Sequence, residues 1–185
     1  MTTTTTKLTF EQYLTYDDGT DNRYELEDGE LILMNPPTGR HAIIIAFLSN
    51  ILFNEINRLQ LPSIPLQVIG VRTSIRRSRL PDLCIVSLEQ MQQYRDVSAV
   101  LESGALLAIE VVSPDSIKRD YRFKRAEYAS FGIPEYWIVD PIEQRVTILL
   151  LVEGLYEEII YQGDNPIQSQ LFPELMLTVN QILQV

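Results

Sequence analysis

The sequence is very poor in cysteine and histidine. Among its 185 residues, Cys84 is the single cysteine and His41 is the single histidine. One thiol cannot form an internal disulfide or a cysteine cage for zinc, so disulfide-rich secreted domains and zinc fingers are excluded. We therefore expect a cytoplasmic protein that is kept in a reducing compartment.

Long hydrophobic runs are also missing from the sequence. The longest candidates, residues 42–48 and 146–152, fall well short of the roughly 18 consecutive apolar residues of a membrane-spanning helix. The start, Met1 and five threonines, has neither the basic nor the apolar region of a secretory signal. We expect no membrane association and one domain over residues 1–185, in which residues 1–8 are flexible.

Positive charge is scarce overall, with 15 Lys and Arg against 25 Asp and Glu, a formal net charge of -10. At first sight this argues against nucleic acid, because phosphates are bound through Lys and Arg. Most of the basic residues are nevertheless gathered in two short windows. The first window holds Arg72, Arg76, Arg77 and Arg79, and the second holds Lys118, Arg119, Arg122, Lys124 and Arg125. Each window is either a solvated surface or a surface that binds DNA.

Hydrophobic spacing predicts an α/β fold with one mixed central sheet flanked by helices. Helices are expected at residues 40–59 and 117–131. Strands are expected at residues 65–71, 79–87, 105–113 and 135–139, and hairpins at residues 24–34 and 146–161. The turns Asp28-Gly29 and Glu153-Gly154 mark the two hairpins. Residues 88–104 are expected to form a polar loop or a short helix.

Two acidic residues interrupt strands that are otherwise apolar. Asp82 opens one such strand and Glu110 lies in the middle of another. An unpaired carboxylate in apolar surroundings is costly, so each must be protonated, paired with an arginine or bound to a cation. Two carboxylates, a backbone carbonyl and water supply the oxygen ligands that Mg²⁺ prefers. Such a metal would polarise a phosphate and activate water.

The second predicted helix places charged side chains on one face. Asp120, Lys124 and Tyr128 follow one another at i, i+4 and i+8. Asp120 and Lys124 either form an ordinary surface ion pair or face the sheet. In the second arrangement the Lys124 ammonium would stabilise the charge that develops on a phosphate under attack.

Several segments together resemble a known family. They are Pro81-Asp82, residues 24–31 (YELEDGEL), residues 110–114 (EVVSP), Asp120, Lys124, Tyr128 and residues 132–140 (GIPEYWIVD). The chain is similar to the Uma-type endonuclease family, formerly a domain of unknown function, within the PD-(D/E)XK restriction-endonuclease-like superfamily. The resemblance implies an αβββαβ core with N-terminal and C-terminal β-hairpins.

The resemblance also implies a metal-dependent endodeoxyribonuclease, with Asp82, Glu110 and Lys124 as catalytic residues. Mg²⁺ or Mn²⁺ would be held by Asp82, Glu110 and the carbonyl of Val111. The chain departs from the superfamily motif at Val112, which stands where the motif has lysine. Lys124 on the following helix is the matching replacement.

Three further residues are candidates for supporting roles. Glu25 matches the family's N-terminal motif and would be an additional acidic ligand, or else a solvated strand charge. Asp120 accompanies Lys124. His41 would contact a phosphate or transfer a proton, or else serve as a cap or a surface residue.

The expected substrate is DNA, gripped by Arg72, Arg76, Arg77, Arg79, Lys118, Arg119 and Arg122. One active site cuts one strand, so cleavage of a duplex would require a homodimer, for which the C-terminal hairpin is a candidate surface. Two alternatives stay open. The chain is a catalytically inactive module that binds nucleic acid or protein, or an enzyme acting on another phosphate-containing or small-molecule substrate.

Overall fold

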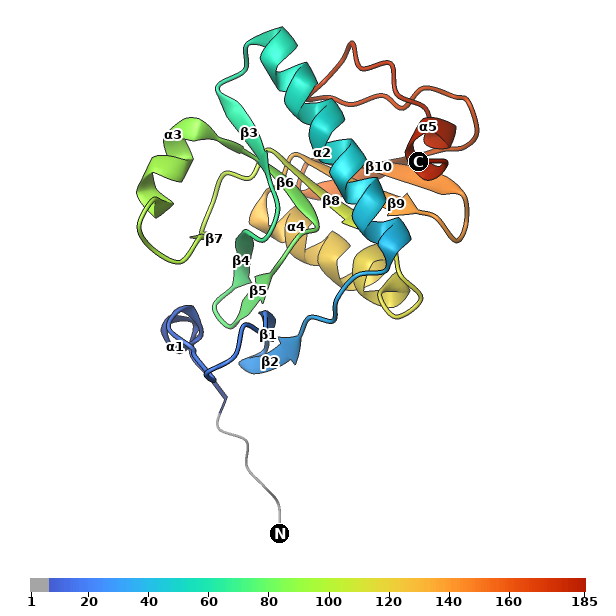
Figure 1. The fold of residues 1–185 in the computed structure, drawn as a ribbon. Coiled ribbons are helices and arrows are strands. Elements are labelled where there is room, and N and C mark those ends of the chain that lie inside the picture. Colours follow the sequence, from blue (N-terminus) through green and yellow to red (C-terminus); the bar gives the residue numbers. More distant parts are fainter. Residues whose placement is uncertain (1–6) are drawn as a thin grey trace.

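The computed structural model describes residues 7–185, and its strands form two mixed sheets (Figure 1). Sheet A runs in the order β2 (Glu30–Leu33), β1 (Tyr24–Glu27), β5 (Arg77–Arg79), β4 (Gly70–Ser74) and β7 (Val100–Leu101). Sheet B runs in the order β11 (Leu155–Tyr161), β10 (Arg145–Val152), β9 (Glu135–Asp140), β8 (Leu107–Val111), β6 (Leu83–Ser87) and β3 (Ser63–Leu66). The α/β class, the αβββαβ order of the core and a mixed central sheet, sheet B, are confirmed, and sheet A is a second sheet beside it.

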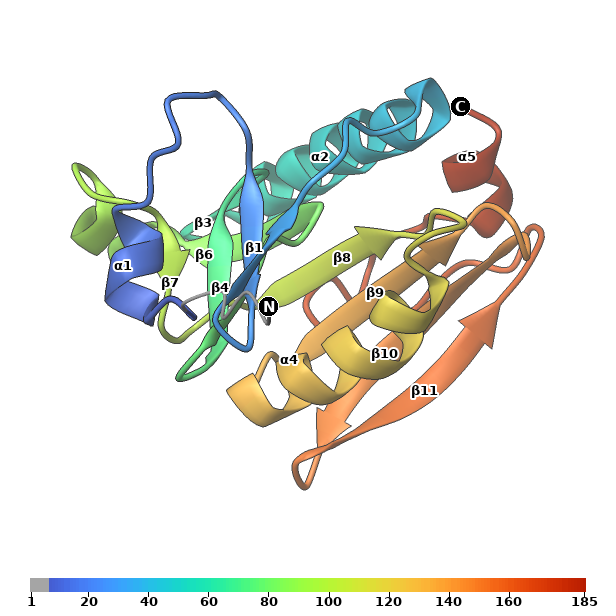
Figure 2. The ribbon, with the colours of Figure 1, turned by 90° about the horizontal axis from the view of Figure 1, so that it is seen from below.

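Two helices cover opposite faces of sheet B (Figure 2). One is α2 (Gly39–Leu59), and the other is α4 (Arg125–Phe131), which continues a π-helical segment, η2 (Arg119–Lys124). The remaining helical segments are short, namely α1 (Phe10–Leu14), α3 (Leu88–Met91), a 3-10 turn (Gln92–Tyr94) and α5 (Val179–Leu183). Both predicted long helices are therefore present, the second with an irregular first half.

The alternation of side chains along β8 decides where the acidic residue of this strand lies. Ile109 and Val111 pack in the hydrophobic cluster that contains the buried face of α2. Ala108 packs in the other cluster, together with Tyr128 of α4. Successive residues of a strand face opposite sides of the sheet, so Glu110 faces α4. The polar side chains of the core are therefore gathered between sheet B and the segment formed by η2 and α4.

Two of the expected strands are interrupted. Residues 67–69 leave sheet B after β3 and enter sheet A at β4. Residues 80–82 make the reverse passage between β5 and β6, where Pro81 has no N–H to donate to a sheet. Asp82 consequently stands just before β6, at the point where the chain passes between the sheets, and not inside a continuous strand.

Both predicted hairpins are present with the turns that the sequence indicates. Asp28 and Gly29 have φ angles of 49° and 86°, and Glu153 and Gly154 have 49° and 83°. Two successive positive φ angles are the geometry of a type I′ turn, which matches the twist of a two-stranded hairpin. The first hairpin joins sheet A and the second extends sheet B to its edge.

The helix α2 is long and apolar enough to cross a membrane by length and composition alone. Its side chains Leu48, Leu52 and Ile56 are buried in the cluster formed with sheet B. A core helix of a soluble protein passes the same test, so one such helix is weak evidence for a membrane span. The expected flexibility of residues 1–8 falls mostly on residues 1–6, outside the described part of the chain.

Candidate active site

Asp82 and Glu110 lie on neighbouring chain segments in the wall of a cleft of about 760 Å³. The Asp82 Oδ2 atom accepts a hydrogen bond of 2.7 Å from the backbone N–H of Val111. Its Oδ1 atom lies 3.2 Å from Nε2 of His41. The orientation of Asp82 is therefore set by the strand that carries Glu110.

Glu110 is almost completely buried and uses one carboxylate oxygen for its contacts. Its Oε1 accepts a hydrogen bond of 2.6 Å from the Tyr128 hydroxyl and lies 2.7 Å from Nζ of Lys124. Burial raises the pKa of Glu110 to about 8, because the opposing effect of Lys124 is smaller and Asp82 raises the pKa further. The pKa of Glu110 therefore lies near neutral pH even with the Lys124 ammonium beside it.

Lys124 is buried among carboxylates. Its Nζ lies 2.7 Å from Glu110, 3.5 Å from Glu25 and 3.6 Å from Asp120. Burial favours the neutral amine, but the surrounding carboxylates outweigh this effect and raise the pKa of Lys124 above its usual value. The side chain is thus an ammonium that faces the sheet, which is the second of the two arrangements expected from the sequence.

The π-helical winding of η2 lies at this site. Its residues Asp120 and Lys124 are both buried, and their charged ends lie next to each other. Asp120 Oδ2 accepts a hydrogen bond from the Ser116 hydroxyl, whereas its Oδ1 is buried without a hydrogen-bond partner. Burial raises the pKa of Asp120, and Lys124 opposes that rise. Short π-helical segments are frequent at functional sites.

A second buried cation, Arg79, supports Glu25. Arg79 donates two hydrogen bonds of 2.7 Å to Glu127 and one of 3.0 Å to Oε2 of Glu25. The other oxygen of Glu25 accepts the N–H of Leu80 at 3.0 Å. Burial tends to raise the pKa of Glu25, but Lys124 and Arg79 outweigh burial and bring the pKa below its usual value. Glu25 is therefore an ionised interior group and not a solvated strand charge.

The expectation that Arg79 contacts DNA was wrong, because its side chain has no exposed surface. Two other arginines of the first basic window also have acidic partners: Arg72 lies 2.8 Å from Glu102, and Arg77 lies 2.7 Å from Asp28. Arg76, at the turn between β4 and β5, is exposed. None of these four arginines lines the cleft.

The cationic residues that line the cleft come from other segments. They are Arg23, Arg119 and Lys124. Lys118 and Arg122 are exposed next to them on the chain. Arg23 lies outside both basic windows, so no signal in the sequence singled it out. The contacts of Lys118, Arg119 and Arg122 with DNA stay predictions.

His41 belongs to the first turn of α2 and takes part in two contacts. Its backbone N–H donates to the Thr38 hydroxyl, which caps the helix at 3.3 Å. Its imidazole contacts Asp82 and also lines the cleft. The His41 backbone therefore takes part in the helix cap, while its imidazole faces the site. Each of the two alternatives expected from the sequence, a cap and a site residue, describes part of this arrangement.

The side chains at the site could coordinate a hard divalent cation only together with a backbone carbonyl oxygen. Among residues 7–185, no group of three His, Cys, Asp or Glu side chains is placed to hold a metal ion. Glu110 Oε2 has no hydrogen-bond partner in this part of the chain, and Asp82 and Val111 line the same cleft. Two carboxylates, a carbonyl and water form an oxygen set that suits Mg²⁺.

Several residues of the site were not assigned a role from the sequence. Tyr128 was placed on the face of Lys124 by its spacing, but its hydrogen bond to Glu110 was not foreseen. Nothing in the sequence indicated a role for Ser116 or Glu127. Ser116 matters through its hydrogen bond to Asp120, four residues away, and Glu127 matters through its hydrogen bonds with Arg79, which is distant in the chain. The sequence did not distinguish buried Arg79 from the exposed or partly exposed arginines of the same short window.

Comparison with known proteins gives a matching family model and solved structures of similar fold. A family model, Uma2, described as "Putative restriction endonuclease", matches residues 10–180. A crystal structure of a putative nuclease belonging to DUF820 from Anabaena variabilis ATCC 29413 has a TM-score of 0.79 and 18% sequence identity. The alignment covers 96% of this chain and 98% of that one, which shows a shared fold. No curated protein matches the chain.

Replacement of Arg79 by methionine should destabilise the protein by about 3–5 kcal/mol, because Glu25 and Glu127 each lose a buried cationic partner. Arg58→Met on α2 is the control and should cost far less, since its pairs with Glu55 and Glu174 lie at the surface, outside the interior network. Urea unfolding at neutral pH measures both. Equal losses in the two variants would contradict the importance of the interior network.

Proposed function

The chain belongs to the Uma2 family of putative restriction endonucleases, and from this premise we propose that it is a metal-dependent endodeoxyribonuclease. One observation carries the proposal: Asp82, Glu110 and the Lys124 ammonium come from three separate segments and meet at the wall of one cleft. This combination of two carboxylates and a buried ammonium suits hydrolysis of a phosphodiester.

Asp82, Glu110 and the carbonyl of Val111 would hold Mg²⁺ or Mn²⁺. When bound, the metal supplies a Lewis acid for the phosphate and lowers the pKa of a coordinated water. Hydrogen bonds within the protein orient the two carboxylates. The Val111 N–H holds Asp82, and the Tyr128 hydroxyl holds one oxygen of Glu110.

Lys124 supplies a fixed positive charge next to the reacting phosphate. Glu25 and Asp120 hold its ammonium in place, and their charges keep it protonated. A charge that is positioned before the reaction needs no reorganisation when negative charge develops on the phosphate. His41, which contacts Asp82, is placed to contact the phosphate or to move a proton.

DNA would enter the cleft along its cationic wall. Arg23 and Arg119 line this wall, and Lys118 and Arg122 extend the positive charge beside it. Phosphate contacts of this kind position the strand without reading its sequence. The acidic remainder of the chain would limit nonspecific binding.

Duplex cleavage by this site would use a homodimer formed through β11. This strand is the edge of sheet B and exposes Leu155, Ile159 and Ile160. An exposed apolar edge strand offers unpaired backbone groups to a second strand. Sedimentation should show a dimer that Ile160→Lys converts to monomers, and a monomeric wild-type chain would exclude this assembly.

Wild-type protein with Mg²⁺ or Mn²⁺ should nick supercoiled plasmid DNA. Asp82→Asn and Lys124→Met should each lower the rate by about a hundredfold or more, because each removes charge from the site. Asp96→Asn, in an exposed loop, is the matched control and should keep full activity. Activity that survives in Asp82→Asn would refute the site. Binding of DNA without cleavage by the wild type would favour the inactive module.

Metal binding should depend on pH through Glu110. A cation replaces the proton of this carboxyl group, whose pKa is about 8, so Mn²⁺ affinity should rise about tenfold per pH unit from about pH 6 to 8 and level off above. Thermal stabilisation by Mn²⁺ at fixed concentration measures this effect. Glu110→Gln should show no stabilisation, and an equal stabilisation of the wild type at pH 6 and 8 would contradict the assignment.

A further inference from the structure

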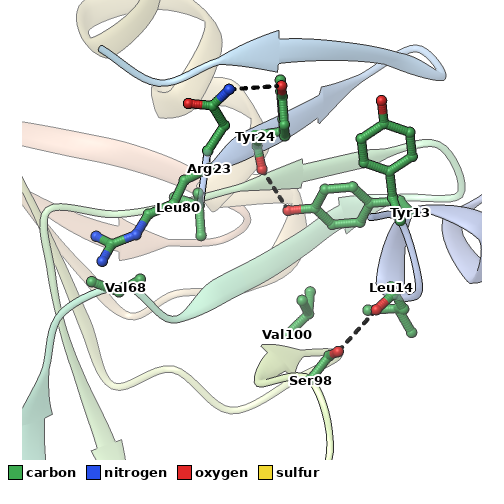
Figure 3. Close-up of a pocket in the computed structure, with 10 residues that line it drawn as sticks. Tyr13, Leu14, Arg23, Tyr24, Val68, Leu80, Ser98 and Val100 are labelled. Carbon is green, nitrogen blue, oxygen red and sulfur yellow. Dashed lines mark hydrogen bonds between the residues drawn. The ribbon is translucent and has the colours of Figure 1, made fainter. Parts of the chain in front are cut away.

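A second hollow, here called the tyrosine recess, adjoins the active-site cleft. It has a volume of about 210 Å³, and Tyr13, Tyr16 and Tyr24 contribute to its wall. Figure 3 shows Tyr13 and Tyr24 in this wall. Four residues line both the recess and the cleft: Asn22, Arg23, Val68 and Leu80. The two hollows therefore share a boundary.

The aromatic wall is held in place by hydrogen bonds. The Tyr13 hydroxyl donates to the carbonyl of Tyr24 at 2.8 Å (Figure 3). The Tyr24 hydroxyl donates to Asp18 at 2.6 Å. Tyr16 meets the Tyr24 ring edge-on, with 5.7 Å between the ring centroids, and is 44% exposed. The recess therefore offers preformed aromatic surface, part of which is open to solvent.

The boundary between the two hollows carries a free positive charge. Arg23 lines both hollows and has no ion-pair partner within residues 7–185. This distinguishes it from Arg72, Arg77 and Arg79, which are all paired with carboxylates. An unpaired guanidinium at the mouth of an aromatic recess suits a phosphate whose attached base enters that recess.

Val68 stands at the same boundary in a strained conformation. Its φ is 61°, and it is the only β-branched residue among the five non-glycine residues with positive φ in residues 7–185. Such a conformation is costly for a β-branched side chain and persists only where the surroundings impose it. The apolar side chain of Val68, 50% exposed, lines both the cleft and the recess. Apolar side chains in such positions act as wedges between stacked bases.

We propose that the tyrosine recess binds an unpaired nucleobase of the strand held in the cleft. This inference rests on the proposed nuclease function. The base stacks against Tyr16 and Tyr24, Arg23 contacts the adjoining phosphate, and Val68 fills the place that the base leaves. Stacking on aromatic rings accepts every base, since each base has a π-face.

The test uses a single-stranded oligothymidylate in which thymine is replaced by 5-iodouracil, with EDTA present to prevent cleavage. Ultraviolet light should crosslink the oligonucleotide to the full-length chain, and peptide mapping should place the crosslink on Tyr16 or Tyr24. Tyr16→Ala should weaken binding, measured by anisotropy of an end-labelled strand, by about five- to 150-fold. Phe53→Ala is the matched control, since this aromatic ring is 46% exposed on α2 and lines neither hollow.

Val68→Gly separates a role in binding from a role in folding. Glycine adopts a positive φ without strain, so the melting temperature should be equal or higher, whereas crosslinking at the tyrosines should fall. Gln60→Gly, at a φ of 53° outside both hollows, is the control and should leave crosslinking unchanged. Wild-type binding with crosslinks only elsewhere, or undiminished binding by Tyr16→Ala, would overturn the recess and leave the nuclease proposal standing. No binding of the strand at all would overturn the recess, whereas the nuclease proposal is tested separately by plasmid nicking with metal present.

Discussion

The structure depends on the pairing of two cations inside the protein. A lysine and an arginine cannot stay charged in an apolar interior unless carboxylates surround them, and removal of one partner leaves the others uncompensated. Lys124 meets Glu25, Glu110 and Asp120, and Arg79 meets Glu25. These partners come from sheet A, from sheet B and from η2, so the network joins the layers of the fold at the place where the chemistry is expected. Glu25 contacts both cations and thereby links the two halves of the network.

The N-terminal hairpin gives the chain two neighbouring surfaces on one short strand. Glu25 of β1 points into the interior and holds Lys124, while the residues just before it, Arg23 and Tyr24, line the tyrosine recess. Tyr24 and Glu25 are successive residues of β1 and face opposite sides of the sheet, so this strand serves both the open surface and the buried network. The recess and the buried network therefore share β1.

Local patterns predicted much of the fold correctly, for reasons that the structure makes clear. The Asp-Gly and Glu-Gly turns adopt positive φ angles that fix both hairpins. The long apolar stripe of α2 is matched by a buried face on sheet B. The expectation failed at residues 65–71 and 79–87, where an apolar run continues while the chain crosses between the two sheets. Hydrophobic spacing indicates that a segment is buried, but it does not indicate in which sheet the segment lies.

The sequence by itself determined that Glu110 stands in an apolar strand and that Asp120, Lys124 and Tyr128 share a helical face. Both conclusions follow from local periodicity, which the chain cannot change without exposing its core. Only the tertiary structure decided which partner neutralises each charge. It placed Arg79 in the interior, left Arg23 unpaired at the cleft, and brought Val68 to the mouth of the recess. The partners of a buried charge lie far apart in the chain, about fifty residues for Arg79 and Glu25, and local sequence carries no information about that distance.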